Sequence, residues 1–419
     1  MSTADTKPNS ASATSFPLHK IKVVLLENVH PLASENLSAE GYDIECVNGS
    51  LAGDELVEAC RDAHMIGIRS KTQLTRAFFE SCERLWGVGC FCIGTNQVDL
   101  PAASELGVTV FNAPFSNTRS VAELTISEII ALHRRLHDRS RAMHEGRWVK
   151  SAAGAHEVRG RTLGIIGYGR IGSQVSVLAE AMGMRVLYHD VIDTLPLGNA
   201  KLIASIEALL GESDVVSLHV PQTDGTAGMI GAREIAQMKP GALLINNARG
   251  NVVDVDALAE ALTSGRLGGA AVDVFPEEPA SNDAEFITPL KGLENVILTP
   301  HVAGSTQEAQ RNIAAEVSGK LAKFMNVGST TTSVNVPEVE LPRLHEDHHR
   351  ILHYHRNVPG VLSAINDVIA KAGANVAAQH LQSNPHHSYM IMDVSSGEAG
   401  EIARGLRRIE ETIRVREVW

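Results

Sequence analysis

Three short apolar runs in the second half of the chain each lead into a side chain that can carry a charge or a proton. The runs end near Arg249, Glu278 and His301. Apolar runs of this length, closed by turn residues, predict buried strands. Because ligands bind at the carboxyl ends of strands in an open parallel sheet, we expect these three side chains to meet at one edge. They would supply an anion clamp and a proton-transfer pair. The runs, with the turn residues that close them, are residues 243–250, 269–279 and 296–301.

Each of the three side chains has a separate expected role. His301 is the natural acid or base, and a carboxylate such as Glu278 on its far ring nitrogen would fix the tautomer and raise the imidazole pKa. The planar guanidinium of Arg249 would hold a substrate carboxylate and carbonyl oxygen. Singly, each residue also fits a structural role, as a helix cap, a solvated turn residue or a loop histidine. Their joint occurrence after three predicted strands favours catalysis.

A glycine-rich turn upstream predicts a dinucleotide site. Residues 167–172 read GYGRIG, which follows an apolar strand at 162–166 and opens a helix ending near Gly183. The glycines allow a tight turn and the close approach of a pyrophosphate to the helix N-terminus. After the next strand, Asp190 would accept hydrogen bonds from ribose hydroxyls and repel a 2′-phosphate, so NAD is favoured over NADP. A glycine-rich turn without a dinucleotide is the alternative.

The elements around these motifs predict an α/β chain with a parallel sheet in each larger domain. Ser120 with Glu123, and Ser305 with Glu308, predict capping boxes at the starts of two long helices. Ser, Thr and Pro residues predict a linker at 328–343. The following βαββαβ pattern is typical of a ferredoxin-like domain. We therefore predict a disordered segment at 1–18, a discontinuous flavodoxin-like substrate-binding domain at 19–117 and 305–342, a Rossmann-type NAD domain at 118–304, and a ferredoxin-like domain at 348–419.

Composition argues against several functional classes. A net charge of −12 disfavours nucleic acid and anionic membranes as partners. No apolar run reaches about 18 residues and the first segment lacks an apolar h-region, so we expect a cytoplasmic protein without a membrane span. The five cysteines are odd in number and lack metal-ligand spacing, so neither a disulfide framework nor a metal site is expected. The many histidines near the C-terminus overlap the linker, and we expect no metal there either.

The motifs also resemble a known family. They are similar to those of the D-2-hydroxyacid dehydrogenases, and within that family to the D-3-phosphoglycerate dehydrogenases of serine biosynthesis, in the short form that ends in an ACT domain. The resemblance covers nearly everything from about Ile21 onward and implies that Arg249, Glu278 and His301 are the catalytic set. The matching segments are 68–70, 89–96, 111–123, 164–172, 273–279 and 299–301. The cofactor contacts that motif and resemblance imply are Gly167, Gly169, Arg170, Ile171, Gly172, Asp190, Asn247, Ala248, Arg249, Asp273, His301, Val302, Ala303 and Gly304. The sequence departs from the family pattern at Ala248, where serine is usual, and at Ala303, where glycine is frequent.

Phosphoglycerate is highly anionic, so an acidic protein needs concentrated cations near its cleft. Arg69 and Lys71, after a predicted strand, are the best candidates, although an ordinary solvated loop is the alternative. A second basic stretch at 134–150 contains Trp148, and in similar enzymes this arm packs across a dimer interface. Paired interfaces at two domains suggest a homotetramer. The expected substrate contacts are Arg69, Ser70, Lys71, Asn117 and Arg249.

The C-terminal domain has neither a nucleophile arrangement nor a phosphate loop, and it resembles an ACT domain, a sensor of small molecules. The resemblance implies L-serine as the effector, with His355, Asn357 and Asn375 as its binding residues. Serine feedback on a first committed step could restrain hinge motion at the cleft. A purely oligomerising domain is the alternative.

The resulting expectation is NAD-dependent oxidation of D-3-phosphoglycerate to 3-phosphohydroxypyruvate, with reduction of 2-oxoglutarate as a further activity of similar enzymes. A dehydrogenase for another D-2-hydroxy acid is the enzymatic alternative. An NAD-sensing corepressor with a dehydrogenase fold is a different class, which the sensor-like tail and the absence of long recruitment segments disfavour. Serine binding without any NAD reduction would instead indicate a noncatalytic serine-binding protein.

Overall fold

The computed structural model describes residues 17–279, 283–342, 348–395 and 399–418. The chain forms two compact units, residues 1–114 with 311–419 and residues 115–310. Of the segment predicted to be disordered, residues 1–16 lie outside the described residues, and a short 3-10 helix, Leu18–Lys20, precedes the first strand. The described residues contain no helix long and apolar enough to span a membrane.

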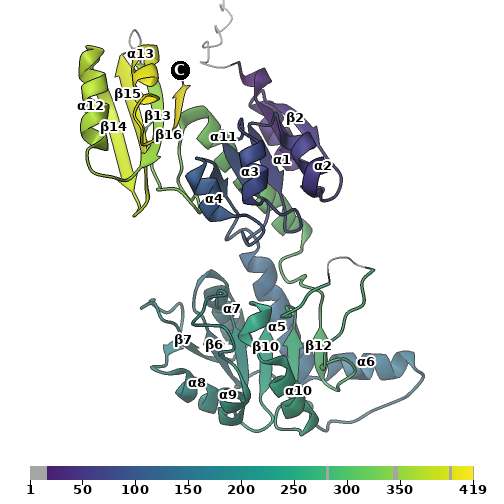
Figure 1. The fold of residues 1–419 in the computed structure, drawn as a ribbon. Coiled ribbons are helices and arrows are strands. Elements are labelled where there is room, and N and C mark those ends of the chain that lie inside the picture. Colours follow the sequence, from purple (N-terminus) through teal and green to yellow (C-terminus); the bar gives the residue numbers. More distant parts are fainter. Residues whose placement is uncertain (1–16, 280–282, 343–347, 396–398, 419) are drawn as a thin grey trace, which may run out of the picture. The chain divides into compact units, whose positions relative to one another are not determined.

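The first unit contains a five-stranded parallel sheet of the predicted flavodoxin-like type. Its strand order is β2-β1-β3-β4-β5, the doubly wound order in which the chain reverses direction beside β1. Apolar clusters cover both faces, one of which packs against α11. A Cβ atom on Gly89 would lie 2.6 Å from Val317 of that helix, so glycine permits the close contact. The strands are β1 Lys22–Leu25, β2 Asp43–Cys46, β3 Met65–Ile68, β4 Gly87–Cys90 and β5 Thr109–Phe111, and the helices are α1 Leu32–Ala39, α2 Gly53–Cys60, α3 Arg76–Ser81, α4 Leu100–Glu105 and α11 Gln307–Val327 (Figure 1).

The second unit contains a seven-stranded parallel sheet with the order β12-β11-β10-β9-β6-β7-β8. Helices α5 and α7 pack on one face, and α8, α9 and α10 on the other. This is the predicted Rossmann arrangement, with every strand pointing its carboxyl end toward the same edge. The strands are β6 Thr162–Ile166, β7 Arg185–His189, β8 Lys201–Leu202, β9 Val215–Leu218, β10 Leu243–Asn246, β11 Gly269–Val272 and β12 Val296–Leu298, and the helices are α5 Thr118–His133, α6 Leu136–His144, α7 Arg170–Ala181, α8 Ile206–Glu212, α9 Ala232–Gln237 and α10 Val255–Thr263, with the 3-10 turn Gly250–Val252 (Figure 1).

Both predicted capping boxes are wrong in detail. Helix α5 begins at Thr118, two residues before Ser120, and the Ser120 hydroxyl lies 2.8 Å from the Thr306 hydroxyl instead of capping the helix. Helix α11 begins at Gln307, and Thr306, not Ser305, accepts a hydrogen bond from the Ala309 N–H. The pattern of serine and glutamate located both helices, but neighbouring threonines and tertiary hydrogen bonds decide where they begin.

The C-terminal residues form an antiparallel four-stranded sheet with two helices, as the βαββαβ pattern predicts. The strand order is β14-β15-β13-β16, which places the first and third strands at the centre. One face packs against α12 and α13 through an apolar cluster that includes Ile351, Ile365 and Met392. The elements are β13 His348–Arg356, α12 Val361–Lys371, β14 Val376–Ser383, β15 His387–Ser395, α13 Ala399–Leu406 and β16 Thr412–Val418.

The stretch predicted to be a linker is instead packed. Thr330 is fully buried, and its hydroxyl donates a hydrogen bond to the Pro337 carbonyl. Further along, the Val334 N–H donates to the Val110 carbonyl at the edge of the five-stranded sheet. The serines and threonines here satisfy backbone groups in a compact loop, so their abundance does not signify flexibility.

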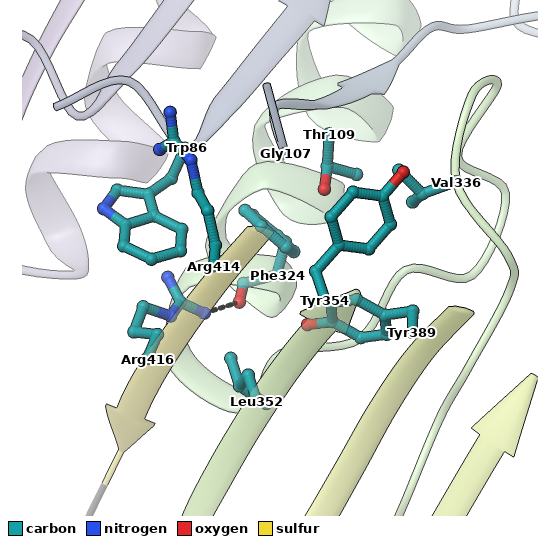
Figure 2. A pocket seen from close by; sticks show the side chains of 10 residues that line it. All are labelled: Trp86, Gly107, Thr109, Phe324, Val336, Leu352, Tyr354, Tyr389, Arg414 and Arg416. Atoms are coloured by element: carbon teal, nitrogen blue, oxygen red, sulfur yellow. Dashed lines mark hydrogen bonds between the residues drawn. The ribbon is translucent and has the colours of Figure 1, made fainter. Parts of the chain in front are cut away.

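The four-stranded sheet contacts the rest of the first unit through two half-buried arginines of β16, Arg414 and Arg416 (Figure 2). Arg414 donates to the Leu106 and Leu85 carbonyls at 2.7 and 2.5 Å, and Arg416 donates to the Phe324 carbonyl at 2.5 Å. Both guanidinium groups lie over the Trp86 ring, at 5.0 and 5.5 Å. The cavity among these groups, of about 20 Å³, is close to the size of one water molecule.

Candidate active site

The glycine-rich turn lies between β6 and α7. Gly167 has a φ of +94°, and a Cβ atom on it would lie 2.5 Å from the His219 carbonyl oxygen. A Cβ on Gly172 would lie 2.2 Å from the Gly167 carbonyl oxygen, whereas one on Gly169 would meet nothing within 4 Å. The outer glycines thus allow close packing, and the middle glycine leaves open space before the N–H groups of α7. This cradle fits the pyrophosphate of a dinucleotide.

Asp190 follows β7, at the same edge of the sheet. Its carboxylate accepts hydrogen bonds from the Tyr168 and Ile192 N–H groups, at 2.6 and 2.9 Å, which ties the side chain to the glycine turn. Carboxylate oxygens accept more than one hydrogen bond, so Asp190 retains capacity for ribose hydroxyls. The exposed side chains of Val191 and Ile192 provide an apolar surface beside it, suited to a nucleobase.

Arg170 begins α7, and its guanidinium lies 3.6 Å from the centroid of the Phe115 ring. The ring holds the cation by a cation–π contact at the edge where the glycine turn opens. Ile171 follows Arg170 on α7 and packs against the apolar cluster between the sheet and helices α5 and α7.

The proton-transfer pair comes from the segments after β11 and β12. The Nδ1 atom of His301 lies 3.0 and 2.9 Å from the two carboxylate oxygens of Glu278. The hydrogen bond to Glu278 raises the pKa of His301 above its usual value, against the opposing effect of burial. Burial would raise the pKa of Glu278, but the hydrogen bond and charge of His301 outweigh it, and the pKa of Glu278 is lowered. Because Nδ1 is engaged, the other ring nitrogen, Nε2, is the atom that can exchange a proton with a ligand.

Asp273 holds the loop that presents His301. Its fully buried carboxylate accepts hydrogen bonds from the Val302 and Ala303 N–H groups, both at 2.9 Å, and from the Thr299 hydroxyl at 2.6 Å. His301 itself has a φ of +54°, a left-handed conformation that is unfavourable for a residue with a side chain. The carboxylate therefore keeps the backbone in the conformation that aims the imidazole.

Two glycines allow close contacts between the segments that follow the strands at this edge of the sheet. A Cβ atom on Gly304 would lie 2.1 Å from the Asn117 amide nitrogen, so a larger residue there would displace the Asn117 side chain. A Cβ on Gly250 would lie 2.0 Å from the Phe275 backbone, so glycine also brings the segment after β10 against that after β11. Arg249 precedes this contact.

Arg249 is half-buried, and its guanidinium donates to the Ala248 carbonyl at 2.7 Å. Its backbone is held by Asn246, whose side-chain amide donates to the Arg249 carbonyl and whose oxygen accepts from the Ala248 N–H. Burial lowers the pKa of Arg249, and the charge of Glu278 opposes that shift. The structure thus brings the predicted cation, carboxylate and imidazole together within the second unit.

The predicted substrate residues are divided between the units. Arg69, Ser70 and Lys71 follow β3 in the first unit, where the Glu27 carboxylate accepts hydrogen bonds from the backbone N–H groups of Lys71 and Thr72. The Arg69 carbonyl accepts from the Gln97 amide at 2.6 Å. The loop backbone is therefore anchored, while the Ser70 and Lys71 side chains are exposed. Asn117 and Arg249 belong to the second unit.

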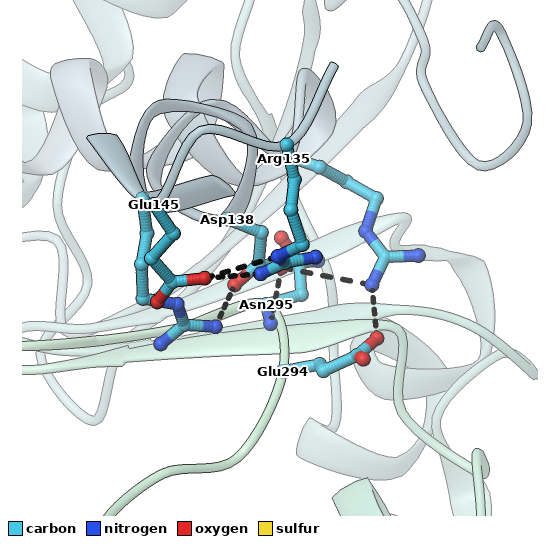
Figure 3. Close-up of polar contacts among 7 residues, drawn as sticks. Arg135, Asp138, Glu145, Glu294 and Asn295 are labelled. Atoms are coloured by element: carbon cyan, nitrogen blue, oxygen red, sulfur yellow. Dashed lines mark hydrogen bonds and ion pairs between the residues drawn. The ribbon is translucent and has the colours of Figure 1, made fainter. Parts of the chain in front are cut away.

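The basic stretch at 134–150 is largely paired with acids (Figure 3). Arg135 lies 2.9 Å from Glu294, and Arg141 lies 2.9 Å from Asp138. The other oxygen of Asp138 accepts from the Asn295 N–H at 2.8 Å, which fixes the turn between α5 and α6. Arg135 and Arg141 are therefore paired with acids of their own chain. Trp148 is 77% exposed, and its expected role at a dimer interface stays a prediction.

The predicted effector residues occupy opposite ends of the four-stranded sheet. His355 and Asn357 lie at the end of β13, where the Asn357 amide donates to the Asn384 carbonyl at 2.8 Å. Asn375 precedes β14 at the other end, since Val376 pairs with Val394 and Val394 pairs with His349. One copy of the domain does not bring the three residues together. Among the described residues, no group of three His, Cys, Asp or Glu side chains is arranged to hold a metal.

Sequence reasoning missed a buried carboxylate beside the site. Glu128 of α5 is 2% exposed and accepts a hydrogen bond from the Asn247 amide at 2.7 Å. The available signal was its position: Val121, Thr125, Glu128 and Leu132 follow a helical repeat of three and four that otherwise marks the buried face.

Comparison with known proteins agrees with this geometry. Residues 126–303 match the D-isomer specific 2-hydroxyacid dehydrogenase, NAD binding domain, and residues 351–414 match the AHAS small subunit-like ACT domain. The chain is similar to the TT0316 protein of Thermus thermophilus, with a TM-score of 0.67 and 31% identity, covering 75% of this chain and 99% of that one. It is also similar to D-lactate dehydrogenase from Aquifex aeolicus complexed with NAD and lactic acid, with a TM-score of 0.64 and 30% identity, covering 72% and 95%.

Two curated relatives match over almost their whole length. D-3-phosphoglycerate dehydrogenase of Haemophilus influenzae is 54% identical over 97% of this chain and 99% of the relative. The enzyme of the same name from Escherichia coli K12 is 52% identical over the same shares. An NAD-binding domain, a histidine–carboxylate pair and a C-terminal ACT domain thus occur together in this chain. The chain belongs to the D-3-phosphoglycerate dehydrogenases, within the D-isomer-specific 2-hydroxyacid dehydrogenase family.

Proposed function

We propose that the protein oxidises D-3-phosphoglycerate to 3-phosphohydroxypyruvate with NAD, the first step of L-serine biosynthesis. The observation that carries the proposal is the His301–Glu278 pair, with contacts of 2.9 and 3.0 Å, at the sheet edge that also bears the glycine cradle. NAD, when bound, accepts a hydride from the substrate carbon. The protein must then remove the hydroxyl proton and hold the carboxylate.

The side chains divide this work. Neutral His301 accepts the hydroxyl proton at Nε2, and Glu278 stabilises the imidazolium that results. Arg249 holds the carboxylate and the oxygen that becomes a carbonyl, which fixes the reacting carbon. Reduction of 2-oxoglutarate would use the same groups in reverse, with protonated His301 as the acid.

The distal phosphate requires cations outside the catalytic pair. We assign this role to Arg69 and Lys71, with hydrogen bonds from Ser70 and Asn117. The anchored backbone of their loop supports the assignment, because a fixed loop loses little conformational freedom when an anion binds.

The direct test is NADH formation from D-3-phosphoglycerate by the purified full chain. The His301→Asn variant should lose at least about 100-fold in kcat while its affinity for NAD changes little, because the proton acceptor is lost and the cradle is not touched. His189→Asn, which alters the histidine that ends β7 of the same sheet, serves as a control for folding. NADH formation from D-lactate but not from D-3-phosphoglycerate would transfer the assignment to another D-2-hydroxy acid.

We further propose that L-serine binds between two copies of the ACT domain and inhibits the enzyme. The separation of His355 and Asn357 from Asn375 supports a shared site, since an edge-to-edge pair of sheets in opposite orientation brings one end of each copy to the other end of its partner. A dimer or tetramer follows from this arrangement.

Replacing Asn357 by Ala should raise the serine concentration for half inhibition by about tenfold or more, because the loss of one polar contact to a charged ligand costs roughly 1.5–3 kcal/mol. Gln382→Ala, an exposed amide on β14, is the matched control. Undiminished inhibition of the Asn357 variant would reject this site, and light scattering with and without serine would test the oligomer.

A further inference from the structure

A buried acid–amide pair lies directly behind the segment that carries Arg249. Asn247 follows β10, two residues before Arg249, and is 6% exposed. Its amide nitrogen donates to Glu128 Oε2 at 2.7 Å and to the Thr125 hydroxyl at 3.1 Å. Glu128 and Thr125 both lie on α5, which packs against β10 and β11. The pair therefore joins helix α5 to the segment that leads into the substrate clamp.

Two atoms of this pair are buried without a hydrogen-bond partner among the described residues. They are Oε1 of Glu128 and Oδ1 of Asn247. Both are acceptors when Glu128 is ionised, so neither can satisfy the other. They belong to the two groups that the 2.7 Å hydrogen bond already joins. Buried polar atoms nearly always have a hydrogen-bond partner. Two unpaired atoms in two groups that already contact each other therefore suggest one common cause.

A single proton satisfies both atoms. A carboxylic acid and a primary amide can form a cyclic pair, in which the amide N–H donates to one carboxyl oxygen and the acid O–H donates to the amide oxygen. We propose that Glu128 is a positioning residue that holds Asn247 as a neutral carboxylic acid, through this two-point pair, and so fixes the backbone that presents Arg249. This inference rests on the proposed function, because it assigns Glu128 to the same reaction.

The surroundings favour the neutral acid. Burial raises the pKa of Glu128 to about 7, the hydrogen bond from Asn247 acts against that shift, and the negative charge of Asp273 adds to it. Asp273, after β11, already accepts hydrogen bonds from the Thr299 hydroxyl and from two loop N–H groups, so its oxygens are engaged away from Glu128. Asn247, directly after β10, is the group that donates to Glu128, and Thr125 of the same helix accepts from the same amide. Within the described residues, Asp273 is the charged group that raises the pKa of Glu128.

The pair connects to Arg249 through a short backbone path. Asn247 is held by Glu128, while Asn246 on its other side bonds the Ala248 N–H and the Arg249 carbonyl. Ionisation of Glu128 removes the second hydrogen bond and places a second negative charge near Asp273. We expect this to loosen the segment and to affect the hydroxy acid more than NAD, since Arg249 holds the substrate.

The first test measures the proton directly. Infrared difference spectra of full-length wild type against Glu128→Gln, both loaded with NAD at pH 6, should show the carbonyl band of a protonated carboxylic acid in the wild type. A carboxylate band in its place would overturn the proposal. This readout needs no turnover, so it is independent of whether D-3-phosphoglycerate is the substrate.

The second test separates positioning from simple structural support. Glutamine reproduces both hydrogen bonds of the cyclic pair, so Glu128→Gln should keep kcat/KM within about threefold of wild type at pH 6. It should lack the decline above about pH 7 that ionisation of Glu128 causes in wild type, while the fall at low pH that His301 causes should remain. Glu128→Ala should lose at least about tenfold in kcat/KM for the hydroxy acid, with a smaller change in the KM for NAD.

Glu123→Gln is the matched control, because it makes the same chemical change at an exposed position of the same helix. It should leave activity and its pH dependence unchanged. Failure of glutamine to replace Glu128 at pH 6, in a variant whose circular dichroism and melting match wild type, would show that the charge is required and would overturn the neutral-acid assignment.

Discussion

At the scale of single residues, the site depends on carboxylates with different tasks set by their surroundings. Asp273 is buried and saturated by backbone N–H groups, so it shapes the loop that carries His301. Glu278 is more exposed and bonds the imidazole itself. His301 has a left-handed backbone conformation, which persists only where the surroundings enforce it. Asp273 enforces this conformation, so Glu278 is left to bond the imidazole.

The His301–Glu278 pair makes a prediction about pH. Oxidation of the alcohol requires neutral His301, so kcat/KM should fall as the pH drops below the raised pKa of His301. Glu278→Gln removes the charge that raises this pKa and leaves at most a weaker hydrogen bond between neutral groups. The fall should therefore move about one pH unit lower, with kcat reduced at least about tenfold because the tautomer is no longer fixed.

The measurement is a pH profile of NADH formation, with Glu277→Gln as the control at the exposed neighbouring position. The ion pair should also affect unfolding. Because the pKa of His301 is raised in the folded state, its contribution to stability is present below the unfolded value near 6.5 and disappears as the pH rises through the raised value. A Glu278→Gln profile that coincides with wild type would contradict the assigned pair.

At the scale of elements, the periodicity of apolar residues in the sequence was sufficient to predict most of the strands and helices. Strand β6 has the predicted bounds, and β3 and β7 end directly before Arg69 and Asp190 as predicted, because each is a short apolar run between turn residues. Strand β2 was not predicted: it is an edge strand with mostly exposed residues, so it lacks the apolar run of a central strand. The glycine-rich turn and the three strands that end near Arg249, Glu278 and His301 could be predicted from the order of elements along the chain alone.

What the sequence could not provide were contacts between distant segments. Ser120 is satisfied by Thr306 and not by its own helix, and Thr330 is satisfied by Pro337 and Val339 within a packed loop. Glu128 reads locally as a helix residue, and its environment arises only when α5 covers β10. In each case the local preference is overruled by a tertiary partner.

The element β13 provides a prediction about stability. Arg350 is fully buried and forms a two-point ion pair with Asp393 of β15, at 2.7 and 2.8 Å. It also donates to the Val327 carbonyl after α11 and to the Pro342 carbonyl. Asp393→Leu should lower the free energy of unfolding by about 3–5 kcal/mol, because a buried guanidinium is left without its counter-ion.

The double variant Arg350→Met with Asp393→Leu should lose less than the sum of the single variants, since neither charge is then left unpaired. Urea unfolding of the four proteins gives the coupling free energy. The exposed pair Lys323 and Glu340, also joined across distant segments, is the control and should show coupling below about 1 kcal/mol. Additive losses at Arg350 and Asp393 would refute the role of the pair.

At the scale of the whole molecule, an acidic chain uses many of its cations internally. The net charge is −12, yet Arg350, Arg414 and Arg416 are withdrawn into the first unit, and Arg135 and Arg141 are paired with acids in the second. These five cations are therefore not available to an anionic substrate. Arg249, Glu278 and His301 lie in the second unit, whereas Arg69, Ser70 and Lys71 lie in the first.

The junction around β16 yields the last prediction. Arg414→Met keeps the apolar length of the side chain but leaves the Leu106 and Leu85 carbonyls without their donor, which should cost about 2–4 kcal/mol. The sheet that contains β16 should then separate before the parallel sheets unfold.

Trp86 reports this step because the Arg414 guanidinium lies over its ring at 5.0 Å. With Trp148 and Trp419 replaced by Phe, Trp86 is the only tryptophan in the chain. Its fluorescence in urea should change before the circular dichroism in Arg414→Met, but together with it in the parent protein and in the exposed control Arg407→Met. Coincident transitions with an unchanged midpoint in Arg414→Met would show that these hydrogen bonds do not hold the junction.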